Sequence, residues 1–176
     1  MDIDVIIPLY KPGKELFTLL DLLERQTVPI RRIILMNTEK QYFDRLIAGT
    51  DFTDQYQNVR VYHLTKQEFD HGGTRREGVC RSEAPVFLMM TQDAMPEDTF
   101  LLERLTAHLR DEVAVAYARQ LPGAPLVDGL RMPKRLVLPA SDRGDARMQA
   151  TTRTQASEGP GRKPLSSVQA YICRSP

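Results

Sequence analysis

The sequence predicts an α/β fold with a mainly parallel sheet flanked by helices, followed by an irregular or disordered C-terminal tail. Short apolar runs alternate with segments in which apolar residues recur at helical spacing. Most of these runs are apolar at nearly every position, as expected of strands that are covered on both faces. The alternation stops after Gln120, beyond which Arg, Ser, Thr, Ala, Gly and Pro dominate.

Residues 3–9 are apolar except for Asp4 and predict a buried strand that ends in a Pro-Gly turn. In residues 14–25, leucines at helical spacing predict an amphipathic helix. Residues 31–36 predict a second buried strand. A helix over about residues 40–47 would connect it to the next strand, as the strand–helix alternation of a parallel sheet requires.

Residues 58–64 alternate in character and predict a third strand. A His-Gly-Gly turn then leads into a predicted helix over about residues 74–81, with Thr74 as its N-cap. Residues 86–90 predict a fourth, buried strand, which ends abruptly at Thr-Gln-Asp.

The last predicted elements are a helix over residues 96–109 and a strand over residues 113–118. The helix has a proline near its first turn and acidic residues at its positive end. We expect a folded domain over residues 1–122 and a separate tail over residues 123–176.

Charge supports that division. Residues 1–126 carry 15 basic and 19 acidic residues, a net charge of −4, whereas residues 127–176 carry 9 and 4, a net charge of +5. Low hydrophobicity combined with a charge excess is typical of disordered segments. The tail is therefore expected to be disordered.

Composition excludes several function classes. The net charge of +1 over 176 residues gives no reason to expect a nucleic-acid partner. No apolar run approaches the ~20 residues that span a bilayer, and no signal peptide is visible. Cys80 and Cys173 lack metal-ligand spacing and fit a reducing compartment. We expect a cytoplasmic protein without a transmembrane segment.

Asp93 is the sharpest candidate for a functional residue. In an open parallel sheet, ligands bind at the carboxyl ends of the strands, and Asp93 follows the fourth predicted strand. One carboxylate suffices as the protein anchor for Mg²⁺ or Mn²⁺ when phosphate oxygens and water complete the shell. Such a cation would stabilise a departing diphosphate. The alternative is that Asp93 only caps the turn before Pro96.

Other candidates follow neighbouring strands. Tyr10 could pack beside a nucleobase, although a surface ring is the alternative, and Asn37 could bond a base edge. Arg75, near the start of a helix, could reach a diphosphate, unless it is an ordinary solvated arginine. Gly72 permits close approach of the backbone to a ligand, and His71 is either a ligand contact or a turn residue.

These motifs resemble a known family. Residues 3–11, Ile-Asp-Val-Ile-Ile-Pro-Leu-Tyr-Lys, are similar to the opening of family 2 glycosyltransferases, which have the Rossmann-like glycosyltransferase-A fold. Residues 69–75, Phe-Asp-His-Gly-Gly-Thr-Arg, and residues 91–94, Thr-Gln-Asp-Ala, resemble the rhamnosyltransferase-like branch. The resemblance covers about residues 1–122, with three motifs in the family's order.

The resemblance implies transfer of a sugar, with rhamnose the first expectation, from a dTDP- or UDP-linked donor. The acceptor would be a cell-surface polysaccharide or a lipid-linked precursor, reached at the inner face of the membrane. Pro8 and Tyr10 lie where the family holds the base, Arg75 where it meets the nucleotide sugar, and Asp93 where it binds the metal. Gln92, inside the Thr-Gln-Asp motif, is counted with the nucleotide-binding residues.

The sequence departs from the family in three ways. Thr91 takes the first position of the usual Asp-x-Asp, as in the rhamnosyltransferase-like branch, and Asn37 replaces an Asp that often follows the second strand. The family's acceptor site and general base lie beyond the metal motif, and no residue here is assigned as that base. Residues 165–171 can be read in another frame as Phe-Phe-Cys-Ser-Ser-Val, which resembles a family segment. We therefore expect a frameshift soon after Gly123 and a truncated enzyme with weak activity or none.

Two other functions stay open at this point. A nucleotidyltransferase also places metal-binding carboxylates on an α/β sheet, but it usually has a Gly/Arg/Lys-rich loop after its first strand, which Tyr-Lys-Pro-Gly over residues 10–13 matches poorly. A non-catalytic nucleotide-binding module is the third possibility.

Overall fold

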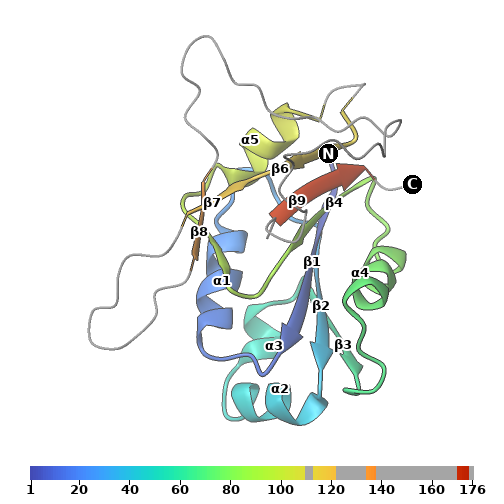
Figure 1. The fold of residues 1–176 in the computed structure, drawn as a ribbon. Helices are drawn as coiled ribbons and strands as arrows, with labels where there is room; N and C mark the ends of the chain where they lie inside the picture. The colour runs from blue at the N-terminus through green and yellow to red at the C-terminus, as the bar shows by residue number, and fades with distance from the viewer. Residues whose placement is uncertain (110–112, 122–133, 138–169, 175–176) are drawn as a thin grey trace.

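The computed structural model describes residues 1–109, 113–121, 134–137 and 170–174. A six-stranded sheet forms its centre. In spatial order the strands are β3 (Val59–Leu64), β2 (Arg32–Thr38), β1 (Ile3–Tyr10), β4 (Val86–Met90), β9 (Ala170–Arg174) and β6 (Val115–Tyr117). Strands β1 to β4 pair in parallel, and β9 runs antiparallel to β4 and β6 (Figure 1). The predicted α/β fold with a mainly parallel sheet is confirmed.

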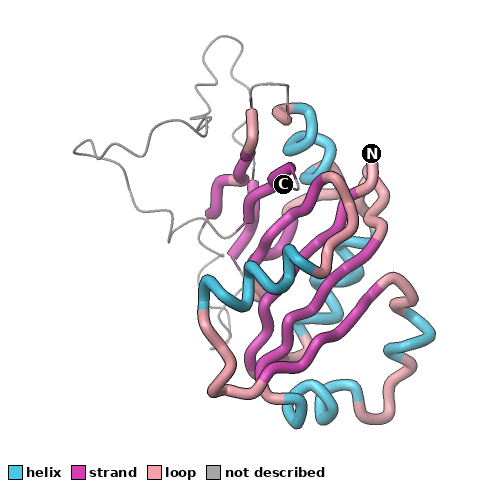
Figure 2. The backbone as a smooth tube through the Cα atoms, turned by 90° about the vertical axis from the view of Figure 1, so that its right-hand side faces the viewer, coloured by secondary structure: helices cyan, strands magenta, loops and turns pink. Residues whose placement is uncertain are grey.

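Helices cover both faces of this sheet (Figure 2). They are α1 (Glu15–Glu24), α2 (Lys40–Ile47), α3 (Phe52–Gln55), α4 (His71–Cys80) and α5 (Leu101–Ala107). The odd-numbered side chains of β1 pack with leucines of α1 and α5 in the larger core cluster. The even-numbered Ile6 packs with Met36 and the half-buried Val79 of α4 in the smaller one. Alternation along β1 therefore assigns α1 and α5 to one face and α4 to the other.

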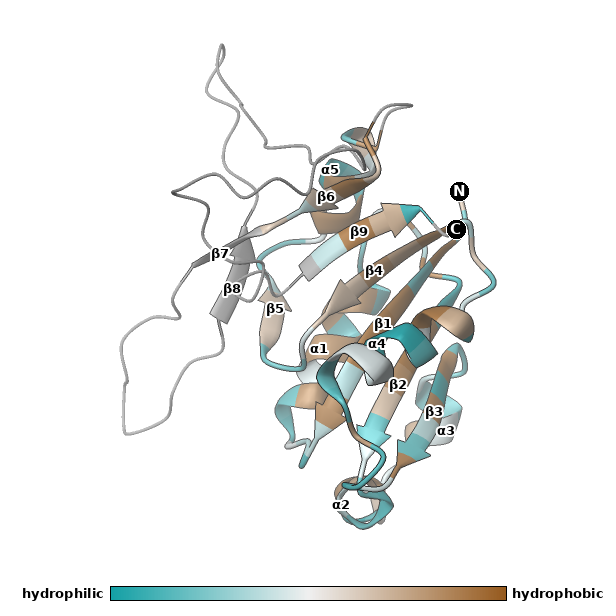
Figure 3. Cartoon of the chain, turned by 45° about the vertical axis from the view of Figure 1, so that its right-hand side comes forward, coloured by the Kyte–Doolittle hydropathy of each residue, from teal (hydrophilic) through white to brown (hydrophobic). Residues whose placement is uncertain are grey.

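The hydropathy of the chain follows these layers, because the strands of the main sheet are largely apolar whereas α4 is largely polar (Figure 3). A second, three-stranded sheet contains β5 (Ala94–Pro96), β8 (Lys134–Val137) and β7 (Arg119–Leu121). In the part of the chain that the structure describes, no helix has the length and apolar character needed to cross a bilayer.

Helix α4 begins earlier than predicted. Its N-cap is Asp70, whose carboxylate accepts a hydrogen bond from the Gly73 N–H, so the prediction of Thr74 as N-cap is wrong. Thr74 is buried inside the helix, and its hydroxyl accepts a bond from the Asp70 N–H at 3.4 Å. The two glycines before Thr74 allow the extra turn, because a Cβ on Gly73 would lie 3.2 Å from the Asp70 carboxylate.

Helix α5 begins later than predicted. Pro96 ends β5, where it is paired in register with Leu136, and α5 starts only at Leu101. Buried Gln26, which follows α1, accepts a hydrogen bond from the Leu102 N–H at 3.1 Å. Gln26 thus satisfies a donor at the start of the helix that no residue within α5 can satisfy.

Part of the expected irregular tail is regular. Among residues 123–176, the structure describes strands β8 and β9, and the rest of the tail lies outside the described residues. Ile172 is fully buried between β4 and β6, with the half-buried Tyr171 and Cys173 on either side. Burial that alternates with a period of two is typical of a strand. The low average hydrophobicity of the polar segment concealed this pattern in the sequence.

Candidate functional site

Parallel pairing brings the ends of four strands to one edge of the main sheet. Tyr10 is paired in register with Thr38, and Asn37 with His63. Asp93 follows β4, which pairs with β1 on its other side. The candidates Tyr10, Asn37 and Asp93 therefore lie along one edge, where parallel sheets bind ligands.

Tyr10 presents its ring to solvent and stands beside a second tyrosine. Its side chain is 41% exposed, and its ring meets that of Tyr42 on α2 edge-on, with the centroids 6.0 Å apart. The ammonium of Lys11 lies 5.2 Å from the centroid of each ring, close enough for cation–π attraction. Half-buried Pro8 lies two residues earlier in β1. The exposed Tyr10 ring, supported by the half-buried Tyr42 and next to a cation, is suited to stacking on a planar ligand.

Asn37, in contrast, is fully buried. Its Nδ2 donates to Nδ1 of His63 at 3.0 Å, and its Oδ1 has no partner among the described residues. Burial, followed by the positive charge of Lys40, lowers the pKa of His63, which favours the neutral imidazole that this bond requires. A base could reach the Asn37 side chain only after it or its neighbours moved. The neighbouring hydroxyl of Thr38 is likewise buried without a described partner.

The start of α4 carries the next three candidates. Exposed His71 packs edge-on against Phe69 at 5.0 Å, and Gly72 follows it within the first turn. Arg75 is half-buried, and its Nη1 donates to the His71 carbonyl at 2.8 Å. This bond holds the guanidinium back over the first turn, next to the N–H groups that favour an anion.

The Asp70 carboxylate modifies this anion site. The hydrogen bond from the Gly73 N–H is the main reason that the pKa of Asp70 lies below its ordinary value. The sequence reading did not assign it a function. Because a negative charge already caps the helix, a phosphate at this end would depend on Arg75 for its attraction.

Asp93 lies exposed at the end of β4. Its Oδ1 accepts a hydrogen bond from the Thr91 hydroxyl at 2.7 Å, which fixes the carboxylate and leaves Oδ2 as a ligand. In the described part of the chain, no group of three or more His, Cys, Asp or Glu side chains could hold a metal ion. Asp93 could supply one carboxylate ligand to a cation, and phosphate oxygens and water would then have to be the other ligands.

Gln92 joins two parts of this edge. Its side-chain amide accepts from the Tyr10 N–H at 2.9 Å and donates to the Tyr10 carbonyl at 3.1 Å. Both polar atoms of Gln92 are therefore engaged with the end of β1. Its predicted contact with a nucleotide stays a prediction, and it would require these bonds to open.

Tyr171 is a neighbour of the site that the sequence reading missed. It is paired with Met89 in register, and it packs on the same face of the sheet as α4. Burial raises its pKa, while the positive charge of Arg75 acts in the opposite direction, so the two side chains are close enough to interact. The sequence could have indicated Tyr171 as a neighbour of the site only if β9 had been predicted as a strand of the main sheet.

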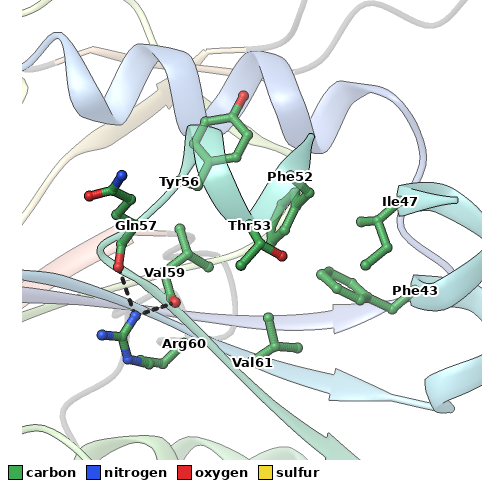
Figure 4. A pocket seen from close by; sticks show the side chains of 9 residues that line it. All are labelled: Phe43, Ile47, Phe52, Thr53, Tyr56, Gln57, Val59, Arg60 and Val61. Carbon is green, nitrogen blue, oxygen red and sulfur yellow. Dashed lines mark hydrogen bonds between the residues drawn. The ribbon is translucent and has the colours of Figure 1, made fainter. Parts of the chain in front are cut away.

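A cavity of about 280 Å³ lies elsewhere, between α2, α3 and β3. Phe43, Phe52 and Val61 are among its apolar walls, with Arg60 bonded to the Val59 carbonyl (Figure 4). This cavity contains none of the predicted site residues. Because Val59 and Arg60 begin β3, the cavity extends toward the opposite end of the sheet from Asp93.

Comparisons with known proteins place the chain in a family. The family model described as glycosyl transferase family 2 matches residues 4–165. The chain is 28% identical over 124 residues to the O-antigen chain rhamnosyltransferase RfbN of Salmonella typhimurium, and 30% identical over 121 residues to the O-antigen chain rhamnosyltransferase WbaN of Salmonella anatum. These matches cover 69% and 67% of this chain but 38% and 36% of the two relatives.

A solved structure shares the fold. The mannosyltransferase PcManGT from Pyrobaculum calidifontis, in complex with GDP-Man and Mn²⁺, superposes with a TM-score of 0.55 at 12% identity. The match covers 68% of this chain and 36% of that chain. The match thus spans a little over a third of the length of each of these three proteins.

Proposed function

The chain belongs to glycosyl transferase family 2, and we propose that it binds a nucleoside-diphosphate sugar at the edge formed by Tyr10, Arg75 and Asp93. The observation that carries this proposal is the direct hydrogen-bonded link between the end of β1 and the Thr-Gln-Asp segment after β4. It brings an exposed aromatic ring and a cation ligand to one site, and a nucleoside diphosphate offers a ring and a charged group for them.

Each residue has a distinct role in this proposal. Tyr10 stacks on the base, and Pro8 shapes the backbone before it. Arg75 contacts the diphosphate, with His71 and Gly72 forming the turn that receives it. A divalent cation would neutralise the charge on the leaving diphosphate. Asn37 is kept as a further contact of the nucleotide, whereas a direct contact of Gln92 with it would require the bonds of Gln92 to Tyr10 to open.

We propose Asp93 as the anchor of that cation, with Mg²⁺ or Mn²⁺ as its identity. The exposed carboxylate, held from one side by Thr91, supports this role. The Mn²⁺ in the PcManGT structure is a feature of that protein and supports the choice of metal by analogy. The general base of the reaction is not assigned to a residue of this chain.

For the sugar we propose rhamnose, carried by dTDP or UDP, because both curated relatives are rhamnosyltransferases. For the acceptor we propose a polysaccharide chain or its lipid-linked precursor, as their names indicate for O-antigen. Such an acceptor would place the protein in the cytoplasm, at the inner face of the membrane. The frameshift expected after Gly123 stays a prediction, and so does weak or absent transfer by this chain.

Thermal unfolding with a ligand panel tests the donor site. We expect dTDP or UDP to raise the Tm in the presence of Mn²⁺, by several degrees at saturating ligand, since ~100-fold excess over Kd stabilises by about 2.7 kcal/mol. Asp93→Asn should abolish the part of the shift that depends on metal, and Arg75→Ala should weaken it.

Asp51→Asn serves as the control, because Asp51 is an exposed carboxylate outside the proposed site. A folded wild-type protein that responds to none of dTDP, UDP or GDP with Mn²⁺ would contradict the proposed function. A response to CTP alone would favour a nucleotidyltransferase. Sugar transfer by the purified chain that Asp93→Ala abolishes would overturn the expectation of weak activity.

A further inference from the structure

The pairing between β1 and β4 ends early. The register runs from Ile3 with Val86 to Ile6 with Met89 and goes no further, although β1 continues to Tyr10. Backbone N–H groups alternate in direction along a strand, so Pro8 and Tyr10 face the same side. Tyr10 bonds to Gln92 on the β4 side, and Pro8 on that side has no N–H to donate. The ladder between the two central strands therefore opens at Pro8.

The Gln92 side chain closes this opening. A primary amide carries one carbonyl and one N–H₂ group, so it can replace a peptide unit as the partner of a strand. Here Oε1 accepts from the Tyr10 N–H at 2.9 Å, and Nε2 donates to the Tyr10 carbonyl at 3.1 Å. The backbone N–H fixes which amide atom is the oxygen, since only an acceptor can face it.

The next residue after Gln92 is the proposed cation ligand. Asp93 is held by its own neighbour, Thr91, on the other side of Gln92 in the sequence. Gln92 bonds to the backbone of Tyr10. Tyr10 is 41% exposed, and its ring is the proposed base-stacking group. One side chain thus links the backbone under the ring to the segment that carries the carboxylate.

From this geometry we infer that Gln92 is a positioning residue, which holds the base end and the metal end of the donor site at a fixed separation. The inference rests on the proposed function. Gln92 contributes without touching the nucleotide, because its two polar atoms are already bonded to Tyr10. A nucleoside diphosphate with its cation bridges both ends, so it gains most from a separation that is set before binding.

Amide hydrogen exchange, measured by NMR, tests the contact itself. The Tyr10 N–H should exchange slowly in the wild-type protein, although it lies at a strand end. Gln92→Met, which keeps the length but removes both polar atoms, should make it exchange at least 10-fold faster. Gln92→Glu keeps an acceptor for this N–H and should retain most of the protection. Unchanged exchange in Gln92→Met would overturn the inference.

Ligand binding tests the positioning role. For Gln92→Met we expect dTDP or UDP together with Mn²⁺ to bind roughly 10-fold more weakly, because the two ends of the site must then be ordered on binding rather than before it. Affinity for Mn²⁺ alone, followed by electron paramagnetic resonance, should change less than twofold, because Asp93 remains. Gln57→Met is the matched control, since Gln57 is exposed and precedes β3 at the opposite end of the sheet.

The outcomes separate the two proposals. If the wild-type protein binds the nucleotide with Mn²⁺ and Gln92→Met binds it equally well, the positioning role is wrong and the proposed function stands. If the wild-type protein binds neither dTDP nor UDP, the proposed function fails, and the positioning role fails with it. Gln92→Met could also lose as much affinity for Mn²⁺ alone as for the nucleotide together with Mn²⁺. That result would overturn the inference, because it would indicate a damaged metal ligand.

Discussion

At the amino end of β1, Asp4 is a fully buried carboxylate among apolar neighbours. Arg31 clasps it with two bonds, Nε to Oδ1 at 3.0 Å and Nη2 to Oδ2 at 2.7 Å, and the Ser82 hydroxyl donates to Oδ2 at 2.8 Å. Burial alone would raise the pKa of Asp4, but the bonds from Arg31 and Ser82 outweigh it, so this pKa lies below its ordinary value. The pair therefore favours the folded state while Asp4 is ionised.

This pair makes stability depend on pH in a defined direction. Because the folded-state pKa of Asp4 is lowered, its contribution is complete above its unfolded pKa of about 4 and is lost as the pH falls through the folded-state value. We expect Asp4→Asn to lower the free energy of unfolding by roughly 3 kcal/mol at pH 7, because it removes the buried partner of Arg31 and leaves only the exposed Glu83, 3.1 Å away. The deficit should shrink below pH 4. Urea unfolding at several pH values measures it.

Asp2→Asn is the control, because Asp2 is an exposed carboxylate two residues away. It should change the free energy of unfolding by less than about 0.5 kcal/mol, as is usual for surface sites. A deficit in Asp4→Asn that stays constant down to pH 3 would show that ionisation of Asp4 does not stabilise the fold.

The site residues differ in how far the sequence could predict them. Tyr10 and Asp93 follow buried strands directly, so the rule that ligands bind at strand ends was enough to place them at one edge. Gln92 could not be assigned its bonds, because Tyr10 lies 82 positions away and the contact exists only once β1 and β4 are adjacent. Asn37 fitted the same rule as Tyr10, yet its burial against His63 depends on packing that no local pattern encodes.

At the scale of elements, α4 lies unusually close to the sheet. A Cβ built on Gly78 would stand 2.5 Å from Cγ2 of Ile6 and 3.3 Å from Cγ of Met36. Glycine is therefore needed there for the approach of the helix to β1 and β2, although Gly-Ala replacement inside a helix is ordinarily stabilising. The helix also carries Arg75, so its distance from the sheet affects the proposed site.

We expect Gly78→Ala to destabilise the protein by about 1–3 kcal/mol, the usual cost of overpacking. In a helix without such a contact, the same replacement would stabilise the protein by up to about 1 kcal/mol. Chemical denaturation gives the value. The double variant Ile6→Ala with Gly78→Ala supplies the control, because removing Cγ2 of Ile6 makes room for the new methyl group. The double variant should then lose less free energy of unfolding than the sum of the losses in the two single variants. A stabilised Gly78→Ala would rule out the tight contact.

The starts of two helices differ from their predictions, and for different reasons. Local residues predicted the start of α4 at Thr74 and of α5 at Pro96, but Asp70 and Gln26 set the caps that are observed. The N-cap at Asp70 could have been predicted from the sequence, since Asp is a preferred N-cap residue and Asp70 stands just before His-Gly-Gly. The role of Gln26 could not be predicted, because Gln26 lies 76 positions before Leu102 and reaches its N–H only in the folded chain.

At the scale of the whole molecule, β9 brings the last described residues of the chain into the main sheet. It pairs with β4 and β6 and fills the place between them, so neither strand has an open edge there. Cys173 on this strand is half-buried, and burial raises its pKa to about 11, whereas Cys80 is exposed. A thiol reagent at pH 8 should therefore modify Cys80 well before Cys173 in the native protein. Mass spectrometry can measure the modification rate of each cysteine. Equal rates would mean that β9 is not packed between β4 and β6.

Replacement of Ile172 tests whether this C-terminal segment is part of the domain. Its side chain is fully buried between β4 and β6, so we expect Ile172→Ala to lower the free energy of unfolding by about 2–5 kcal/mol. Ile47→Ala, at a half-buried isoleucine of α2, is the matched control and should cost less. A segment translated in the wrong frame would not be expected to supply a strand that fits the sheet in this way. A loss in Ile172→Ala no larger than at an exposed position would therefore support the frameshift, whereas the full loss would mean that residues 170–174 belong to the native fold.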